Sequence, residues 1–157
     1  MKIELICIEK TKKNEYRNII QDYLNRINKK LSFKIKEISF VNPGKYDKKN
    51  ILNKQVNLIQ RYINERDYVV LLDERGKSFS SIDFSKWLNF KISSRDIKCL
   101  KFIIGGPYGF NKKNMNLIHE EISFSKMTFS HQMIRIFFLE QIYRSLKIIN
   151  NEPYHYE

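Results

Sequence analysis

The stretch ISFSKMTFSHQMIR, Ile122–Arg135, predicts a short strand that passes through a loop of small residues into a helix. The strand covers Ile122–Phe124, and Ser130 is the expected N-cap of a helix from His131 to about Ile149. Such a turn can hold a ligand, because a helix N-terminus and a loop backbone offer free polar groups. Taken alone, the stretch fits an ordinary strand–turn–helix connection better.

Strand-like and helix-like patterns alternate along the rest of the chain. The nearly all-apolar strand Tyr68–Leu72 belongs in the middle of a sheet, and Glu74–Lys77 forms the turn after it. Ser80 or Ser81 caps the helix that follows, which runs to about Ile92. The alternation predicts one α/β domain over residues 1–157 with a mostly parallel sheet. The other expected strands are Ile3–Ile8, Leu31–Val41 and Leu100–Ile104, and the other expected helices are Asn14–Ile27, Lys48–Asn64 and Lys112–Glu121.

Composition narrows the class of protein. A hydrophobic fraction of 42% and an aromatic fraction of 13% indicate a packed globular fold. No apolar run reaches the roughly 18 residues of a membrane span, and Glu4 and Glu9 interrupt what would be a signal peptide, so we expect a cytoplasmic protein. Cys7 and Cys99 fall in expected strands as buried thiols, and the histidines have no metal-ligand spacing.

The chain is strongly basic. Its formal net charge of +12 favours a polyanionic partner, with RNA as the first candidate. A second explanation is compositional, since the chain is rich in Lys, Asn and Ile, as proteins of AT-rich genomes are. The charge therefore permits RNA binding without establishing it.

A glycine-rich turn, Gly105–Gly109, follows a buried strand. It has neither the spacing of a dinucleotide fingerprint nor that of a phosphate-binding Walker loop. A tight connection and a ligand loop are equally good interpretations of the turn alone. The ends of the Tyr68–Leu72, Leu100–Ile104 and Ile122–Phe124 strands should, however, share one sheet edge, where α/β proteins bind ligands.

Three segments together carry a family resemblance. They are LLDERGKSFSS at Leu71–Ser81, IIGGPYGF at Ile103–Phe110, and SFSKMTFSHQMIR followed by EQIYR and PYHY. In this order and spacing the chain resembles the RlmH family of small SPOUT-class methyltransferases over essentially its whole length. The resemblance implies a SPOUT-type α/β fold with a C-terminal trefoil knot. The residue pattern by itself would suggest a conventional doubly wound sheet.

The resemblance also implies a cofactor site. Family members bind S-adenosylmethionine in a bent form, mainly through backbone groups. An apolar slot for adenine could be walled by Leu72, Met127 and Phe129, although core packing is the alternative for Phe124, Met127 and Phe129. A sulfonium methyl is already electrophilic, so no metal is expected. The implied contacts are Leu72, Gly105, Phe124, Ser125, Lys126, Met127, Thr128 and Phe129.

The implied reaction is methylation of N3 of a pseudouridine in large-subunit ribosomal RNA, on the assembled ribosome, by a homodimer whose sites each use two chains. Glu140 and Arg144 could equally form a surface ion pair, and Arg135 could hold a phosphate or the partner chain. Tyr154 and His155 suit base stacking and proton transfer, but they lie in a tail. The candidate catalytic residues are Arg135, Glu140, Arg144, Tyr154 and His155.

The chain departs from the family pattern at two places. Ser130 stands where a proline commonly precedes the histidine, and Tyr156 and Glu157 stand where the tail usually carries a basic residue. The second departure weakens a phosphate-binding role for the C-terminus. Two other functions stay open: a non-enzymatic basic protein that binds ribosomal RNA, and a Rossmann nucleotide-binding protein, which the missing fingerprint disfavours.

Overall fold

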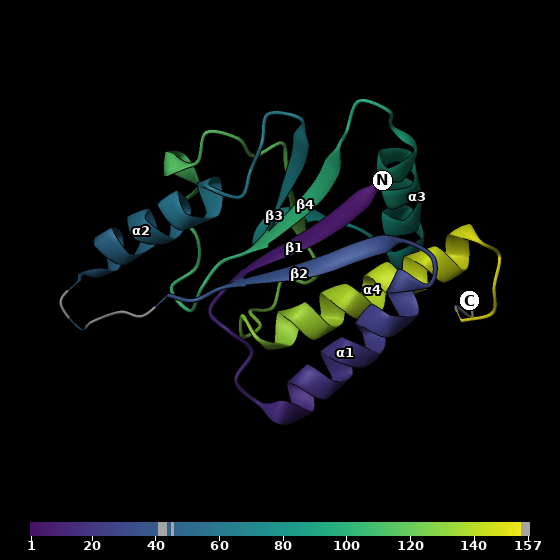
Figure 1. Ribbon diagram of the computed structural model, residues 1–157, viewed down its shortest axis with the longest axis horizontal. Coiled ribbons are helices and arrows are strands. Elements are labelled where there is room, and N and C mark those ends of the chain that lie inside the picture. Colours follow the sequence, from purple (N-terminus) through teal and green to yellow (C-terminus); the bar gives the residue numbers. More distant parts are fainter. Residues whose placement is uncertain (41–43, 45, 155–157) are drawn as a thin grey trace.

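The computed structural model describes residues 1–40, 44 and 46–154, and the chain is built around one five-stranded sheet (Figure 1). The strands lie in the order β2-β1-β4-β3-β5, and every pairing between them is parallel. The predicted mostly parallel sheet is therefore confirmed. The strands are β1 Lys2–Ile8, β2 Ser32–Ile38, β3 Asp67–Ser78, β4 Cys99–Ile104 and β5 Glu120–Ser123.

Helices cover both faces of the sheet. One face packs against α1, α3 and α4, and the other packs against α2 and a short 3-10 turn, η1 (Figure 1). The predicted layering of an α/β fold is confirmed, whereas the trefoil knot stays a prediction. The helices are α1 Asn14–Asn28, α2 Lys48–Gln60, α3 Ser81–Ser93 and α4 Met133–Ile149, with η1 at Lys112–Asn114.

Burial on two sides explains the uninterrupted apolar strands. In β1, Leu5 and Cys7 face the core under α1, α3 and α4, while Ile6 and Ile8 face the core under α2. Successive side chains of a strand point to opposite faces, so a central parallel strand is apolar throughout. Both cysteines are free and buried, as predicted, and burial raises the pKa of the Cys7 thiol to about 12.

The third strand is longer than the sequence suggested. We predicted an end at Leu72 and a turn over Glu74–Lys77, but β3 continues to Ser78. Its pairing with β5 shifts in register between Leu72 and Lys77. Gly76 makes the close passage possible, because an added Cβ would lie 2.6 Å from the backbone of Glu121. The polar residues that were predicted to form a turn instead extend β3 beyond its last pair with β4, Leu71 with Ile103.

The predicted helix Lys112–Glu121 is wrong. Only η1 is helical in this stretch, and β5 begins at Glu120 rather than at Ile122. The backbone of His119 instead donates to the carbonyl of Val69 at 2.9 Å, and its Nδ1 accepts the Val69 N–H at 3.0 Å. Pairing with β3 therefore takes these residues into extended conformation, a tertiary effect that local propensity does not report.

The entry into α4 follows the prediction in chemistry and differs in position. The helix begins at Met133, two residues later than expected from His131. The N-cap position is Gln132 and not the predicted Ser130, and the Gln132 side chain makes no cap hydrogen bond. Ser130 still bonds to the first turn, since its Oγ accepts the Met133 N–H at 3.2 Å and its carbonyl accepts the Ile134 N–H at 3.1 Å. Ser80 caps α3 through the Asp83 N–H.

Smaller differences concern the ends of elements. The second strand stops at Ile38, and α2 ends at Gln60 rather than Asn64. Val41, the predicted end of the second strand, lies outside the described residues. Within the described part of the chain, no helix is both long and apolar enough to cross a bilayer.

Candidate active site

A cavity of about 530 Å³ opens at the carboxyl edge of the sheet. Three segments line it: the end of β3 from Leu72 to Arg75, the loop from Ile104 to Phe110, and the stretch from Ile122 to His131. Its volume suits a small molecule of the size of a nucleoside cofactor. The three loops that the sequence placed at one sheet edge thus meet there, and Leu72, Gly105 and Thr128 line the same cavity.

The glycine turn is closed by its own backbone. The N–H of Gly109 donates to the carbonyl of Gly106 at 2.9 Å, and Gly109 has a φ of 82°. A Cβ on Gly105 would lie 2.6 Å from the Gly109 carbonyl oxygen. Glycine is therefore required for this turn, which brings bare backbone to the wall of the cavity.

Short polar side chains shape the loop after β5. The Ser125 Oγ accepts the Met127 N–H at 2.9 Å, and the Thr128 hydroxyl donates to Glu74 at 2.6 Å. Met127 is 74% exposed, and Phe129 packs on Phe137 with ring centroids 5.0 Å apart. Local hydrogen bonds thus hold two large apolar side chains at the mouth of the cavity instead of in the core.

Of the other three predicted cofactor contacts, Phe124 and Ser125 line the cavity and Lys126 does not. Phe124 borders the cavity but also packs edge-on against Phe84 and Phe138, at 5.4 and 5.9 Å, as the core alternative held. Ser125 lines the cavity, whereas Lys126 does not. Lys126 lies between Ser125 and Met127, which line the cavity, and it is the one predicted cofactor contact that does not line the cavity itself.

Charged groups at the rim were missed by the sequence analysis. Asp73 and Arg75 form a two-pronged pair at 2.8 Å, and the Arg75 hydrogen bonds lower the pKa of the Asp73 carboxyl. Glu74 accepts the Thr128 hydroxyl. These residues had been read as a turn, so no signal assigned them to a wall of the site.

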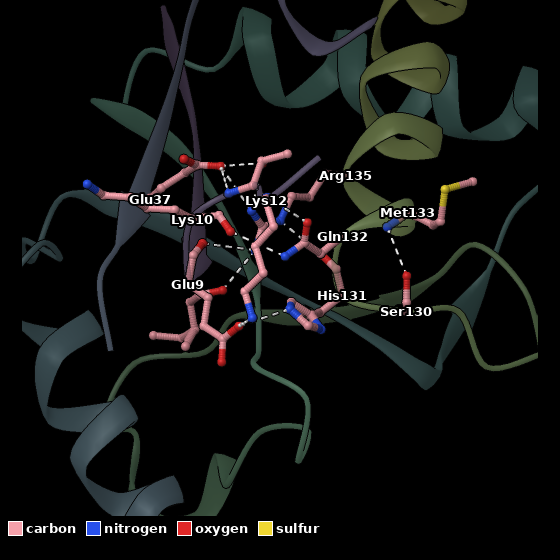
Figure 2. Close-up of polar contacts among 11 residues, drawn as sticks. Glu9, Lys10, Lys12, Glu37, Ser130, His131, Gln132, Met133 and Arg135 are labelled. Atoms are coloured by element: carbon pink, nitrogen blue, oxygen red, sulfur yellow. Dashed lines mark hydrogen bonds and ion pairs between the residues drawn. The ribbon is translucent and has the colours of Figure 1, made fainter. Parts of the chain in front are cut away.

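The start of α4 is bound to the loop between β1 and α1 (Figure 2). Gln132 bridges that loop: its Oε1 accepts the Lys12 N–H at 3.0 Å and its Nε2 donates to the Lys10 carbonyl at 3.2 Å. These contacts join residues about 120 positions apart in the chain. They hold in place the end of the cavity wall at His131, just before α4 begins.

Arg135, one of the predicted catalytic residues, makes its contacts in the interior of the protein. Its side chain is fully buried, and its five N–H groups are directed to partners within the chain (Figure 2). No donor is left for a phosphate, a partner chain or a substrate. The partners are Thr11 Oγ1, Glu37 Oε1 and the carbonyls of Ile8, Glu9 and His131.

Of the remaining catalytic candidates that the structure describes, Glu140 and Arg144 lie on α4 and Tyr154 follows its C-terminal end. Arg144 pairs with Glu140 at 2.6 Å, as the surface-pair alternative held, and its guanidinium also lies 4.9 Å from the ring of Tyr154. Tyr154 packs edge-on against Tyr143 at 4.9 Å, so this part of the tail folds back on its own helix. His155 lies outside the described residues.

Two residues of the site had no place in the sequence analysis as functional groups. His131 was considered only as a helix start, yet its side chain lines the cavity. Glu9 was considered only as a charge near the N-terminus, yet its Oε2 lies 3.4 Å from His131 Nε2. The position of His131 directly after the small-residue loop was the one available signal. No group of three or more His, Cys, Asp or Glu able to hold a metal occurs in the described ranges.

The family model described as "Predicted SPOUT methyltransferase" matches residues 1–155. A Bacteroides fragilis protein named ribosomal RNA large subunit methyltransferase H is 44% identical over 158 residues, with 100% of both chains covered. Proteins of the same name from Parabacteroides distasonis and Christiangramia forsetii are 44% and 43% identical, with 100% and 99% of both chains covered. These full-length matches show that the chain belongs to the SPOUT methyltransferase family.

Proposed function

We propose that this protein transfers a methyl group from S-adenosylmethionine to N3 of a pseudouridine in large-subunit ribosomal RNA, on the assembled ribosome. The observation that carries the proposal is the cavity at the convergence of the three loops. Full-length relatives named ribosomal RNA large subunit methyltransferase H support the RNA substrate. A ribosomal substrate also supports a cytoplasmic location, which is part of the proposal.

The residues of the cavity fit the cofactor. The turn at Gly105 presents backbone without a side chain, where a polar heterocycle edge needs donors and acceptors. Leu72, Met127 and Phe129 supply apolar surface around it. When bound, the cofactor supplies an electrophilic methyl group on a sulfonium, and the protein's task is to bind it, orient the base and accept a proton.

The active unit is a homodimer in this proposal. Ile134, in the first turn of α4, lines the cavity, whereas Tyr154 follows the last residue of the helix, Ile149. The 17 residues of the helix span about 25 Å. Tyr154 therefore reaches a cavity only in a second copy of the chain, and the exposed Phe129–Phe137 pair beside the mouth offers apolar surface for that contact.

The first prediction is methyl transfer itself. With labelled S-adenosylmethionine, the purified protein should methylate ribosomes from a strain that lacks the activity, and mass spectrometry should place the label on N3 of one pseudouridine. Ribosomes that carry uridine at that position are the matched control and should stay unlabelled. Absence of transfer to ribosomes that contain pseudouridine would contradict the proposal.

Calorimetry separates an enzyme from a protein that only binds ribosomal RNA. An enzyme of this kind releases heat with S-adenosylmethionine and with its demethylated product. The non-enzymatic alternative predicts ribosome binding without a heat signal from either compound. A higher affinity for a nicotinamide nucleotide or ATP would instead favour the Rossmann alternative.

The second prediction tests the two-chain site. The double variant Tyr154→Ala and His155→Ala should keep its cofactor affinity and lose most turnover, because the tail acts on the base rather than on the cofactor. Gly105→Ala should lose cofactor binding, since its new Cβ meets Gly109. Mixing the two inactive proteins should restore about a quarter of wild-type activity, because half of the dimers are then mixed and carry one intact site.

One outcome of the mixing experiment would contradict the two-chain site. Chains that exchange, as shown by mass spectrometry of differently tagged copies, but regain no activity would show that each site is built from a single chain. Unchanged turnover in the tail variant would remove the role proposed for Tyr154 and His155. Lys126→Ala is the control on the loop, because its side chain does not line the cavity.

A further inference from the structure

Two buried polar atoms face each other beside the cavity without a hydrogen bond. His131 Nε2 and Glu9 Oε2 are 3.4 Å apart (Figure 2), and both atoms are buried without a hydrogen-bond partner, although Lys12 Nζ forms an ion pair with the same Glu9 oxygen at 3.5 Å. The two side chains are only 17% and 21% exposed. Buried polar atoms without partners are rare, and each needs an explanation such as a catalytic role. For these two atoms the explanation involves a proton. When the imidazole gains a proton it becomes charged, and a charged imidazole forms its strongest hydrogen bond with a carboxylate.

Glu9 is held rigidly in an unusual backbone conformation. Its φ is 68°, in the left-handed region that non-glycine residues seldom adopt. Its N–H donates to the Ile38 carbonyl at 2.8 Å, and its carbonyl accepts from Arg135 at 3.1 Å. Strain of this kind is kept where the surrounding contacts over-determine it, which is common at functional sites. The contacts direct the Glu9 carboxylate at His131.

The other nitrogen of the same ring, Nδ1, is the one left to meet a molecule in the cavity, because Nε2 lies next to Glu9. A neutral imidazole opposite a carboxylate keeps its proton on Nε2, since two lone pairs would repel. Nδ1 then carries the free lone pair. His131 lines the cavity, and of its two nitrogens only Nε2 is sealed and unpaired. Nδ1 is thus the acceptor available to a molecule in the cavity.

The charges around His131 keep it ready to accept a proton. Burial lowers the pKa of His131, and the nearby Arg135 guanidinium and Lys12 ammonium lower it further, whereas Glu9 raises it. The neutral form therefore dominates at neutral pH. The facing groups come from the β1–α1 loop, as Glu9 and Lys12, and from α4, as Arg135, which itself is paired with Glu37.

We propose that His131, oriented by Glu9, is the catalytic residue that removes the N3 proton of the target base. This inference rests on the proposed function and names a residue for its proton step. The N3–H bond breaks, its electron pair stays on N3, and the proton forms a bond with Nδ1 of His131. N3 would then bond to the methyl carbon of S-adenosylmethionine as the carbon–sulfur bond breaks, with that electron pair passing to sulfur to leave a neutral thioether. Glu9 stabilises the imidazolium through Nε2–H, and the proton then passes to solvent.

The test is the pH dependence of single-turnover methylation of ribosomes. In the wild type the rate should rise with pH as His131 loses its proton, and then level. His131→Asn should lower the plateau rate about 100-fold or more and abolish this rise. Glu9→Gln should lower the rate and move the rise to lower pH, because the carboxylate that holds the proton on His131 is gone. Cofactor affinity, measured by calorimetry, should stay within about threefold in both variants.

A second readout does not depend on activity. In NMR titrations of the dimer, the His131 ring signal should titrate at lower pH in Glu9→Gln than in the wild type. His119→Asn is the matched control, since His119 stacks on Tyr68 away from the cavity, and it should keep the wild-type pH profile. A His131→Asn protein with normal rate and normal pH profile would overturn the inference while leaving the methyltransferase intact. A wild type that binds cofactor but methylates no ribosome would refute the proposed function, and the proton step with it.

Discussion

Arg135→Met should lower the free energy of unfolding by about 3–5 kcal/mol, the largest stability loss we expect from one substitution. The guanidinium is fully buried. It donates hydrogen bonds to β1 and β2, to the loop after β1, and to the carbonyl of His131 just before α4. Methionine fills much of its volume but removes the charged partner of Glu37, which keeps only its hydrogen bonds from Thr11. It also removes a donor from the carbonyls of Ile8, Glu9 and His131. Urea denaturation followed by circular dichroism measures the effect.

Arg26→Met is the matched control for this experiment. Arg26 pairs with Asp22 at 2.7 Å on the exposed side of α1, and such pairs contribute less than about 1 kcal/mol. A loss near that small value for Arg135→Met would contradict the anchoring role. Arg135→Lys separates structure from catalysis: stability close to the wild type with lost activity would restore the catalytic interpretation that the buried geometry opposes.

Gly105→Ala should weaken the binding of S-adenosylmethionine by about 5- to 150-fold. Its Cβ would lie 2.6 Å from the Gly109 carbonyl oxygen, and backbone cannot move aside as a flexible side chain can. Relieving a clash of this kind costs about 1–3 kcal/mol, and 1.4 kcal/mol is a tenfold loss of affinity. The turn shifts into the cavity that it borders. Isothermal titration with the cofactor and with its demethylated product measures the change.

Gly44→Ala controls for a general cost of replacing glycine. Gly44 has a φ of 74°, so alanine is strained there, but its Cβ meets nothing within 4 Å and the residue does not line the cavity. We expect a small loss of stability and unchanged cofactor affinity. Equal affinity for Gly105→Ala and the wild type would show that the cofactor binds elsewhere.

Much of the fold followed from hydrophobic pattern. The run in β1 is apolar because both of its faces are buried, and the 3.6-residue spacing in α4 marks the stripe that includes Phe138 and Ile142. The pattern failed where pairing overrode propensity. Within the predicted helix Lys112–Glu121, residues 119–121 pair with β3, and the polar end of β3 is a strand only because Gly76 lets it pass close to β5.

The residues of the candidate site also fall into two groups, those that the sequence predicted and those that it did not. Leu72, Gly105 and Thr128 were placed together from strand order alone, since parallel strands end at one edge. The roles of Arg135 and His131 were not predictable, because each depends on residues more than 95 positions away. A buried arginine and a surface arginine look alike in sequence.

The amino-acid sequence by itself determined the layered α/β architecture, the buried thiols and the edge at which the loops converge. Periodicity reports which side of each element is apolar, and that is a local property. Only the tertiary structure decided that Arg135 anchors the interior, that Glu9 faces His131, and that Tyr154 lies at the far end of α4 from the cavity of its own chain. Those outcomes depend on how α4 packs back onto β1 and its loop, a contact between chain ends that no local pattern encodes.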